Sequence, residues 1–459
     1  MNLRDRTLLT SGFHAPEPGV VEVFEDALIA VDAAGTILSV TRKGDAGYDA
    51  VLEKARSDQR LSTLPSGSWL LPGMVDMHIH APQYPLLGNA LDVPLEVWLE
   101  RYTFPLEARY RHAAFAKRTY SVLVDDLIAN GTTTALYFAT IHEEATRLLA
   151  DICMEKGQRA LIGKVVMDNP DQCPDYYRDA STDAALSQTR AFIDYVRTHP
   201  DNGQGRVQPV VTPRFIPSCT DEALEGLGAI AKDCGCHVQT HCSESDWEHG
   251  YVLARHGVTD TASLDRFGLL GRRSVLAHSN FLTPEDMETV KVRQAAVAHC
   301  PLSNAYFANA VFPLRAALEK GLHVGLGTDI SGGPSVSLFE NCRAAIMASR
   351  MLESGVDPAL PAEQRGAGGN ARIDFRDAFY LATTGGGVAL DLPVGLFAPG
   401  YRFDAIAIDT NAADGTIRLW DELDSGDHIL QKIINTASRA NIADVWIDGA
   451  AVSGVALNS

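Results

Sequence analysis

The apolar positions of the chain change their pattern near residue 68. From there to residue 327, short apolar runs alternate with longer segments whose apolar residues recur at helical spacing. A long series of such strand–helix units predicts a parallel sheet with crossover helices. About eight units over roughly 300 residues favour a closed (β/α)8 barrel of the TIM type over an open sheet. The expected fold class is therefore α/β.

The expected barrel strands are short apolar runs, which cover residues 74–79, 132–138, 159–166, 207–212, 236–241, 274–278, 295–299 and 322–327. The expected helices lie between them, around residues 112–129, 142–156, 183–198 and 311–320, with two more that begin at Thr220 and Thr283. Thr283 followed by Pro284 is a good start signal, because a threonine caps the helix and a proline suits its first turn.

Both ends of the chain have a different pattern, with short strands separated by turn residues. The N-terminal strands are expected at residues 20–23, 27–31 and 37–40, and the C-terminal strands at residues 405–408, 417–419 and 444–447. Residues 49–60 have helical character. We expect residues 1–67 and 393–459 to form one small composite β-sandwich domain, and residues 68–392 to form the barrel.

Composition narrows the range of partners. The formal net charge of −19 argues against a nucleic-acid backbone or an anionic membrane as a partner. Residues 1–18 have no apolar core of the kind a signal peptide needs, and no apolar run approaches the roughly 18 residues of a membrane span. The eight cysteines are scattered, as is typical of reduced thiols in a cytoplasmic protein.

Candidate chemistry lies at the ends of the expected strands. His78 and His80 share one face of a strand, because successive strand side chains alternate. That pair alone is a weak metal signal. Three further strands end in or just before His241, His278 and Asp329, although the chain has only 14 histidines. Functional residues of a barrel lie at the carboxyl ends of its strands, so these side chains are expected to meet there.

The ligand types indicate the kind of metal. Imidazoles with one carboxylate and no thiolate suit Zn²⁺ or Fe²⁺ rather than calcium or magnesium. A position left open for water makes such a site catalytic, since the metal ion lowers the pKa of the water. Glu244 follows His241 by three residues and is the expected general acid and base. The plainer alternatives are a surface role for Glu244 and a buried structural role for His278. His299 stays a further candidate for the lining of the site.

Several segments carry a family resemblance. PGMVDMHIHAPQY, THCSESD, LAHSNFLT, HCPLSN and GLGTDISGG resemble the amidohydrolase superfamily, in the same order. Within it, HAPQYP, WLERYTFPLE and TPRFIPSC resemble the guanine-deaminating branch. This resemblance implies hydrolysis of guanine by water to xanthine and ammonia, in a cytoplasmic homodimer.

The resemblance also implies roles for single residues. It implies one zinc ion per chain, with Fe²⁺ as the alternative, held by His78, His80, His241 and Asp329. Asp329 would also accept a proton from the attacking water, and Glu244 would carry protons to the ring nitrogen and the leaving amine. The implied substrate contacts are Gln83, Arg214, Phe215, His241 and His278, of which His278 would also orient the water.

Competing interpretations concern the substrate and the class. The protein could deaminate another aminopurine or a pterin, or it could be a relative that binds partners without catalysis. A cyclic-amide hydrolase would need two metals bridged by a carboxylated lysine, for which Lys164 is the candidate, and we interpret Lys164 as structural. His142-Glu143-Glu144 is not followed by the P-C-x-x-C of the other zinc deaminases. Gly325-Leu326-Gly327 lacks the third glycine of a dinucleotide loop.

Overall fold

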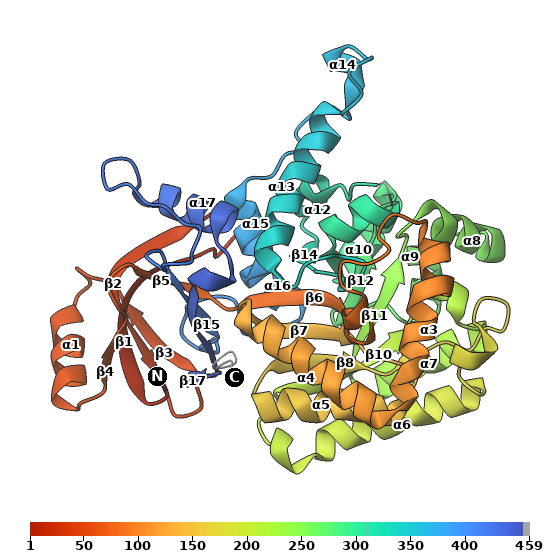
Figure 1. Ribbon diagram of the computed structural model, residues 1–459, viewed down its shortest axis with the longest axis horizontal. Coiled ribbons are helices and arrows are strands. Elements are labelled where there is room, and N and C mark those ends of the chain that lie inside the picture. The colour runs from red at the N-terminus through yellow and green to blue at the C-terminus, as the bar shows by residue number, and fades with distance from the viewer. Residues whose placement is uncertain (309, 453–459) are drawn as a thin grey trace.

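The computed structural model describes residues 1–308 and 310–452, and it contains two separate sheets (Figure 1). The larger sheet forms the barrel, with the strand order β14-β13-β12-β11-β10-β8-β7-β6 and parallel pairing throughout. Its strands are β6 (Met74–His80), β7 (Thr132–Phe138), β8 (Arg159–Gly163), β9 (Val165–Val166), which pairs with β10, β10 (Val207–Pro213), β11 (His237–Cys242), β12 (Ser274–His278), β13 (Ala296–His299) and β14 (His323–Leu326). The expected α/β barrel is confirmed.

Backbone hydrogen bonds close the barrel between its first strand and the segment after its last strand. The Asp329 amide donates to the His78 carbonyl oxygen at 2.8 Å, and the His80 amide donates to the Ile330 carbonyl oxygen at 2.8 Å. The seam of the barrel therefore lies beside the histidines that the sequence singles out. The pairing that completes the fold also places Asp329 next to them.

The first helix packs on the smaller sheet, and most of the others surround the barrel (Figure 1). Each of the seven expected helices is present and begins within three residues of its expected position, and ten further helices in the described part of the chain were not expected. The helices are α1 (Tyr48–Ser57), α2 (Leu95–Trp98), α3 (Phe104–Glu107), α4 (Ala113–Ala129), α5 (Glu143–Lys156), α6 (Thr182–Thr198), α7 (Asp221–Cys234), α8 (Asp246–His256), α9 (Asp260–Arg266), α10 (Pro284–Arg293), α11 (Pro301–Ser303), α12 (Leu314–Lys320), α13 (Leu338–Ser354), α14 (Ala362–Arg365), α15 (Phe375–Ala382), α16 (Thr384–Ala389) and α17 (Asp427–Thr436). Thr283 caps α10 in a capping box with Asp286, as the start signal predicts. Among the described helices, none is long and apolar enough to cross a membrane.

The smaller sheet draws its strands from both ends of the chain, as expected (Figure 1). Its order is β17-β16-β15-β5-β1-β2-β3, with β4 paired to β1. The strands are β1 (Arg6–His14), β2 (Glu22–Val31), β3 (Ile37–Thr41), β4 (Leu61–Thr63), β5 (Ser68–Pro72), β15 (Ala405–Asp409), β16 (Ile442–Ile447) and β17 (Ala450–Ala451). The division at residues 67/68 and 392/393 stays a prediction. β5 begins at Ser68 and belongs to this sheet, and residues 453–459 lie outside the described part of the chain.

Local patterns misplaced some elements at the chain ends. The polar residues 6–14 form strand β1, because pairing with β2 and β5 supplies the backbone partners that the local pattern does not reveal. Residues 20–23 and 27–31 were expected as two strands, but residues 22–31 form the single strand β2. Residues 417–419 form no strand, and the helix α17 was not expected.

Candidate active site

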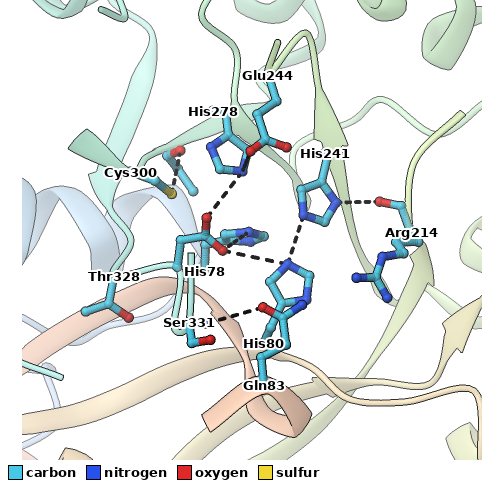
Figure 2. A network of polar contacts seen from close by, with 12 residues as sticks. His78, His80, Gln83, Arg214, His241, Glu244, His278, Cys300, Thr328 and Ser331 are labelled. Atoms are coloured by element: carbon cyan, nitrogen blue, oxygen red, sulfur yellow. Dashed lines mark hydrogen bonds and ion pairs between the residues drawn. The ribbon is translucent and has the colours of Figure 1, made fainter. Parts of the chain in front are cut away.

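The four predicted metal ligands meet at the carboxyl end of the barrel. Figure 2 shows His78, His80 and His241 directed toward one another. His80 Nε2 lies 2.9 Å from His241 Nε2, and His78 Nε2 lies 3.2 Å from Asp329 Oδ1. The same Asp329 oxygen is 3.7 Å from His80 Nε2. All four side chains are buried. The strand ends that lie far apart in the sequence therefore point at one small volume.

The polar atoms of this cluster could hold a metal ion. Burial lowers the pKa of His78, His80 and His241 well below the ordinary value for imidazole, so these rings are neutral and offer lone pairs. The buried Nε2 atoms of His78 and His278 have no hydrogen-bond partner. Buried polar atoms without partners are uncommon in folded proteins, and a divalent ion of the zinc type accepts these donors. The imidazole nitrogens and the Asp329 carboxylate therefore fit a divalent ion of this type.

Neighbouring residues hold the ligands in orientation. His241 Nδ1 donates to the Arg214 carbonyl oxygen at 2.6 Å, which leaves Nε2 free to face the cluster. Asp76, two residues before His78 in β6, accepts from the amide and the hydroxyl of Thr328 at 2.9 and 2.6 Å. This contact ties the start of the β14 loop to β6. The ring of Phe138, at the end of β7, lies 4.8 to 4.9 Å from the rings of His78, His80 and His241.

Glu244 and His278 lie on the other side of the cluster (Figure 2). His278 Nε2 is 3.8 Å from Glu244 Oε1 and 3.8 Å from Asp329 Oδ2. Burial and then the charge of Asp329 raise the pKa of Glu244 well above its ordinary value. His278 and Asp329 have φ values of 66° and 50°, a left-handed conformation that non-glycine residues adopt rarely and mostly at functional sites.

A directed chain of side-chain amides links His278 to the Glu244 loop. Asn280 Nδ2 donates to the Glu244 carbonyl oxygen at 2.9 Å, and Asn304 Nδ2 donates to Asn280 Oδ1 at 2.7 Å. Asn304 Oδ1 therefore faces His278 Nδ1, 2.9 Å away, and must accept from it. Because a carbonyl can only accept, the whole chain has one direction, and neutral His278 carries its proton on Nδ1. The His278 Nε2 lone pair points into the site.

A cavity adjoins these residues at the mouth of the barrel. Its lining includes the predicted substrate contacts Gln83, Arg214 and Phe215. Gln83 comes from the short helix η1 (Ala81–Leu86), and Arg214 and Phe215 follow β10. Trp98 and Phe307 supply apolar walls, with ring centroids 5.1 Å apart. The structure thus brings every predicted site residue except His78 and His278 to the cavity wall. His78 lies behind Asp329, and His278 lies behind Glu244 and Asp329.

Sequence reasoning missed Glu107, which is fully buried at the end of α3. Its Oε1 accepts from Gln83 Nε2 at 2.8 Å and from Arg214 Nη2 at 3.1 Å, and its Oε2 accepts from Arg214 Nη1 at 2.7 Å. Burial works against the charge of Arg214, but Glu107 outweighs it and raises the pKa of the guanidinium. Glu107 ends the WLERYTFPLE segment, so the resemblance contained a signal, but no local pattern distinguishes this glutamate from a surface one.

Two other candidates lie elsewhere. His299 is buried against Phe312, with ring centroids 5.5 Å apart, and it is not among the residues that line the cavity. Lys164 is fully buried in an ion pair with Asp179. A lysine held in this way is not free to bridge two metals as a carbamate.

Histidines gathered with an aspartate at the mouth of a (β/α)8 barrel define a class of metal-dependent hydrolases. The amidohydrolase family model matches residues 69–452. A guanine deaminase of Dictyostelium discoideum is 35% identical over 447 residues, which cover 95% of each chain. The human guanine deaminase is 35% identical over 448 residues, which cover 94% of this chain and 92% of that protein.

The solved structures agree with the sequence relatives. A guanine deaminase from C. acetobutylicum, with guanine bound in its active site, superposes with a TM-score of 0.86 and 31% identity, covering 98% of this chain and 100% of that one. The chain belongs to the amidohydrolase family and, within it, to the guanine deaminase family. It is a hydrolase.

Proposed function

We propose that this protein hydrolyses guanine to xanthine and ammonia, with one divalent metal ion, Zn²⁺ or alternatively Fe²⁺, held by His78, His80, His241 and Asp329. The observation that carries the proposal is the convergence of these ligands and Glu244 beside one cavity whose lining includes Gln83, Arg214 and Phe215. The guanine-bound relative supports guanine as the substrate.

The reaction replaces the C2 amine of guanine by a carbonyl oxygen. When bound at this site, a divalent ion supplies Lewis-acid chemistry that makes water acidic near neutral pH. Asp329 takes the proton that the attacking water loses, and Glu244 delivers a proton to the ring nitrogen beside C2. Glu244 then moves the remaining hydroxyl proton to the amine, which leaves as ammonia, and the proton held by Asp329 returns to Glu244. One water is consumed, and one C–N bond is exchanged for one C–O bond.

The remaining residues bind and orient. Gln83 and Arg214 donate hydrogen bonds to the polar edge of the base, and Phe215 packs against its ring. His278, whose tautomer leaves Nε2 as an acceptor, orients the water between Glu244 and Asp329. The Lys164–Asp179 ion pair argues against a two-metal cyclic-amide hydrolase, because that enzyme would need Lys164 free to be carboxylated and to bridge the metals.

The experiment is ammonia release from guanine by metal-replete and chelator-treated protein. We expect release with the metal-replete protein, complete loss after chelation and recovery when Zn²⁺ is restored, with the metal content measured alongside. Release from another aminopurine or a pterin, but not from guanine, would overturn the proposed substrate and keep the deaminase class. Activity that survives complete removal of the metal would overturn the proposed site.

We also propose that the protein acts as a homodimer in the cytoplasm. The family resemblance supports the dimer, and light scattering at known concentration tests it. All eight cysteines are free thiols, and seven are buried, which suits a reducing compartment. A monomer at micromolar concentration would contradict the dimer.

A further inference from the structure

Glu107, which has no role in the proposed chemistry, pairs with Arg214 at the wall of the cavity. Glu107 and Arg214 form an ion pair in which neither side chain has more than 3% of its surface exposed. Both oxygens of the carboxylate face the guanidinium, and Oε1 also accepts from Gln83 Nε2. One carboxylate therefore contacts both of the residues that we expect to bind the polar edge of the substrate.

This pair decides the charge of the binding end of the cavity. Among the described residues that line the cavity, Arg214 is the one lysine or arginine. A lone guanidinium in a buried cavity attracts anions, because low-dielectric walls strengthen its field. Bound by both oxygens of Glu107, the guanidinium is neutralised, and it still has N–H groups left to donate.

The same carboxylate fixes the direction of the Gln83 amide. Because a carboxylate only accepts, Gln83 must turn its Nε2 toward Glu107. Its Oε1 then accepts from the Ser331 amide at 3.3 Å (Figure 2). Gln83 and Arg214 consequently present donors, without net charge, to whatever enters. Such a surface fits an uncharged heterocycle with acceptor atoms along one edge.

We propose that Glu107 is a specificity-determining residue, which positions Gln83 and Arg214 and cancels the guanidinium charge so that the cavity binds a neutral heterocycle in preference to an anionic one. The inference rests on the proposed function and adds charge selection to it. One consequence is weak retention of the product xanthine once it ionises, since its anion finds no uncompensated guanidinium at this end of the cavity.

The test measures binding rather than turnover. Hypoxanthine, mostly neutral at mildly alkaline pH, and xanthine, mostly a monoanion there, are titrated by calorimetry into metal-replete protein. We expect wild type to prefer hypoxanthine, and Glu107→Gln to shift the ratio of the two dissociation constants toward xanthine by roughly tenfold or more. Glu100→Gln is the matched control, because Glu100 is exposed on the same helical segment, and its ratio should equal that of wild type.

Further variants separate charge from position. Glu107→Asp keeps the charge, so it should keep the wild-type ratio while the KM for guanine rises more than kcat falls. Glu107→Gln combined with Arg214→Gln removes both charges and serves if the single variant does not fold. In this double variant the ratio of the hypoxanthine and xanthine dissociation constants should stay within about threefold of the wild-type ratio, while the affinities for both purines fall.

The outcomes distinguish the two proposals. If wild type releases no ammonia from guanine and binds neither purine, the proposed function fails, and the inference fails with it. If wild type is active but Glu107→Gln weakens both ligands equally, or leaves both unchanged, only the charge selection is overturned. A tenfold loss of discrimination in the double variant would also overturn it.

Discussion

The two ends of the barrel each contain a buried cluster of charged and polar side chains. The clusters differ in whether their polar atoms find hydrogen-bond partners within the cluster. At the amino ends of β8 and β10, Arg159 and Arg206 meet Asp448 in the turn between β16 and β17, at 2.7 and 2.8 Å. Arg159 Nε also donates to Asp404 at 2.9 Å, and Arg402 pairs with Asp448. At the carboxyl ends, by contrast, the buried Nε2 atoms of His78 and His278 have no hydrogen-bond partner.

The pKa shifts separate the two clusters in the same way. Burial alone would raise the pKa of Asp448, but Arg159, Arg402 and Arg206 outweigh it and hold that pKa well below its usual range. At the other end, burial raises the pKa of Asp329 and Glu244. The first cluster is complete and joins the barrel to the sheet of the chain ends. In the second cluster, buried polar atoms without hydrogen-bond partners cost folding free energy. A bound ligand that contacts these atoms explains why the cluster is there.

The largest expected effect concerns the incomplete cluster. Glu244→Gln should lower kcat by about 10²- to 10⁴-fold, because an amide cannot carry the proton that the carboxyl moves. Metal content and Tm should stay at their wild-type values. Glu96→Gln, an exposed glutamate near the mouth, is the matched control and should keep full activity. Full activity of Glu244→Gln would remove Glu244 from the mechanism.

The second prediction tests the complete cluster. Asp448→Asn should lower the free energy of unfolding by about 3–5 kcal/mol, because it leaves buried arginines without their counter-charge. The kcat of the folded variant should change little, since Asp448 lies at the opposite end of the barrel. Denaturant unfolding and steady-state kinetics measure both. Asp391→Asn removes an exposed partner of Arg272 and Arg273 and should cost about 0–1 kcal/mol. Equal losses in the two variants would mean that burial of the cluster does not matter.

The smallest expected effect is the pH dependence of the difference in unfolding free energy between wild type and Asp448→Asn. The folded-state pKa of Asp448 lies below the unfolded value of about 3.9, so its stabilisation is fully present above that pH and is lost as the pH falls through the folded-state pKa. The gap in unfolding free energy between wild type and Asp448→Asn should therefore be constant near neutrality and shrink below about pH 4. A gap that stays constant under acid conditions would show that Asp448 titrates normally in the folded protein.

Much of the barrel and its mouth could be predicted because the signals are local. The alternation of strands and helices follows from apolar spacing, and the strand period of two places His78 and His80 on one face. The barrel rule then gathers His241, His278 and Asp329 from strand ends without knowledge of any contact. Those steps need only neighbours along the chain and one general property of the fold.

Only the tertiary structure decided the partners of single side chains. Residues 6–14 become a strand through pairing with β2, and residues 417–419 do not become one. Glu107 looks like any helical glutamate until α3 folds it against Arg214, and the directions of Asn280 and Asn304 follow from a carbonyl on another loop. The physical reason is that burial and hydrogen-bond complementarity depend on groups far apart in the sequence. The chain alone indicates which residues reach the mouth of the barrel, whereas the fold decides which charges are cancelled there and which are left for a ligand.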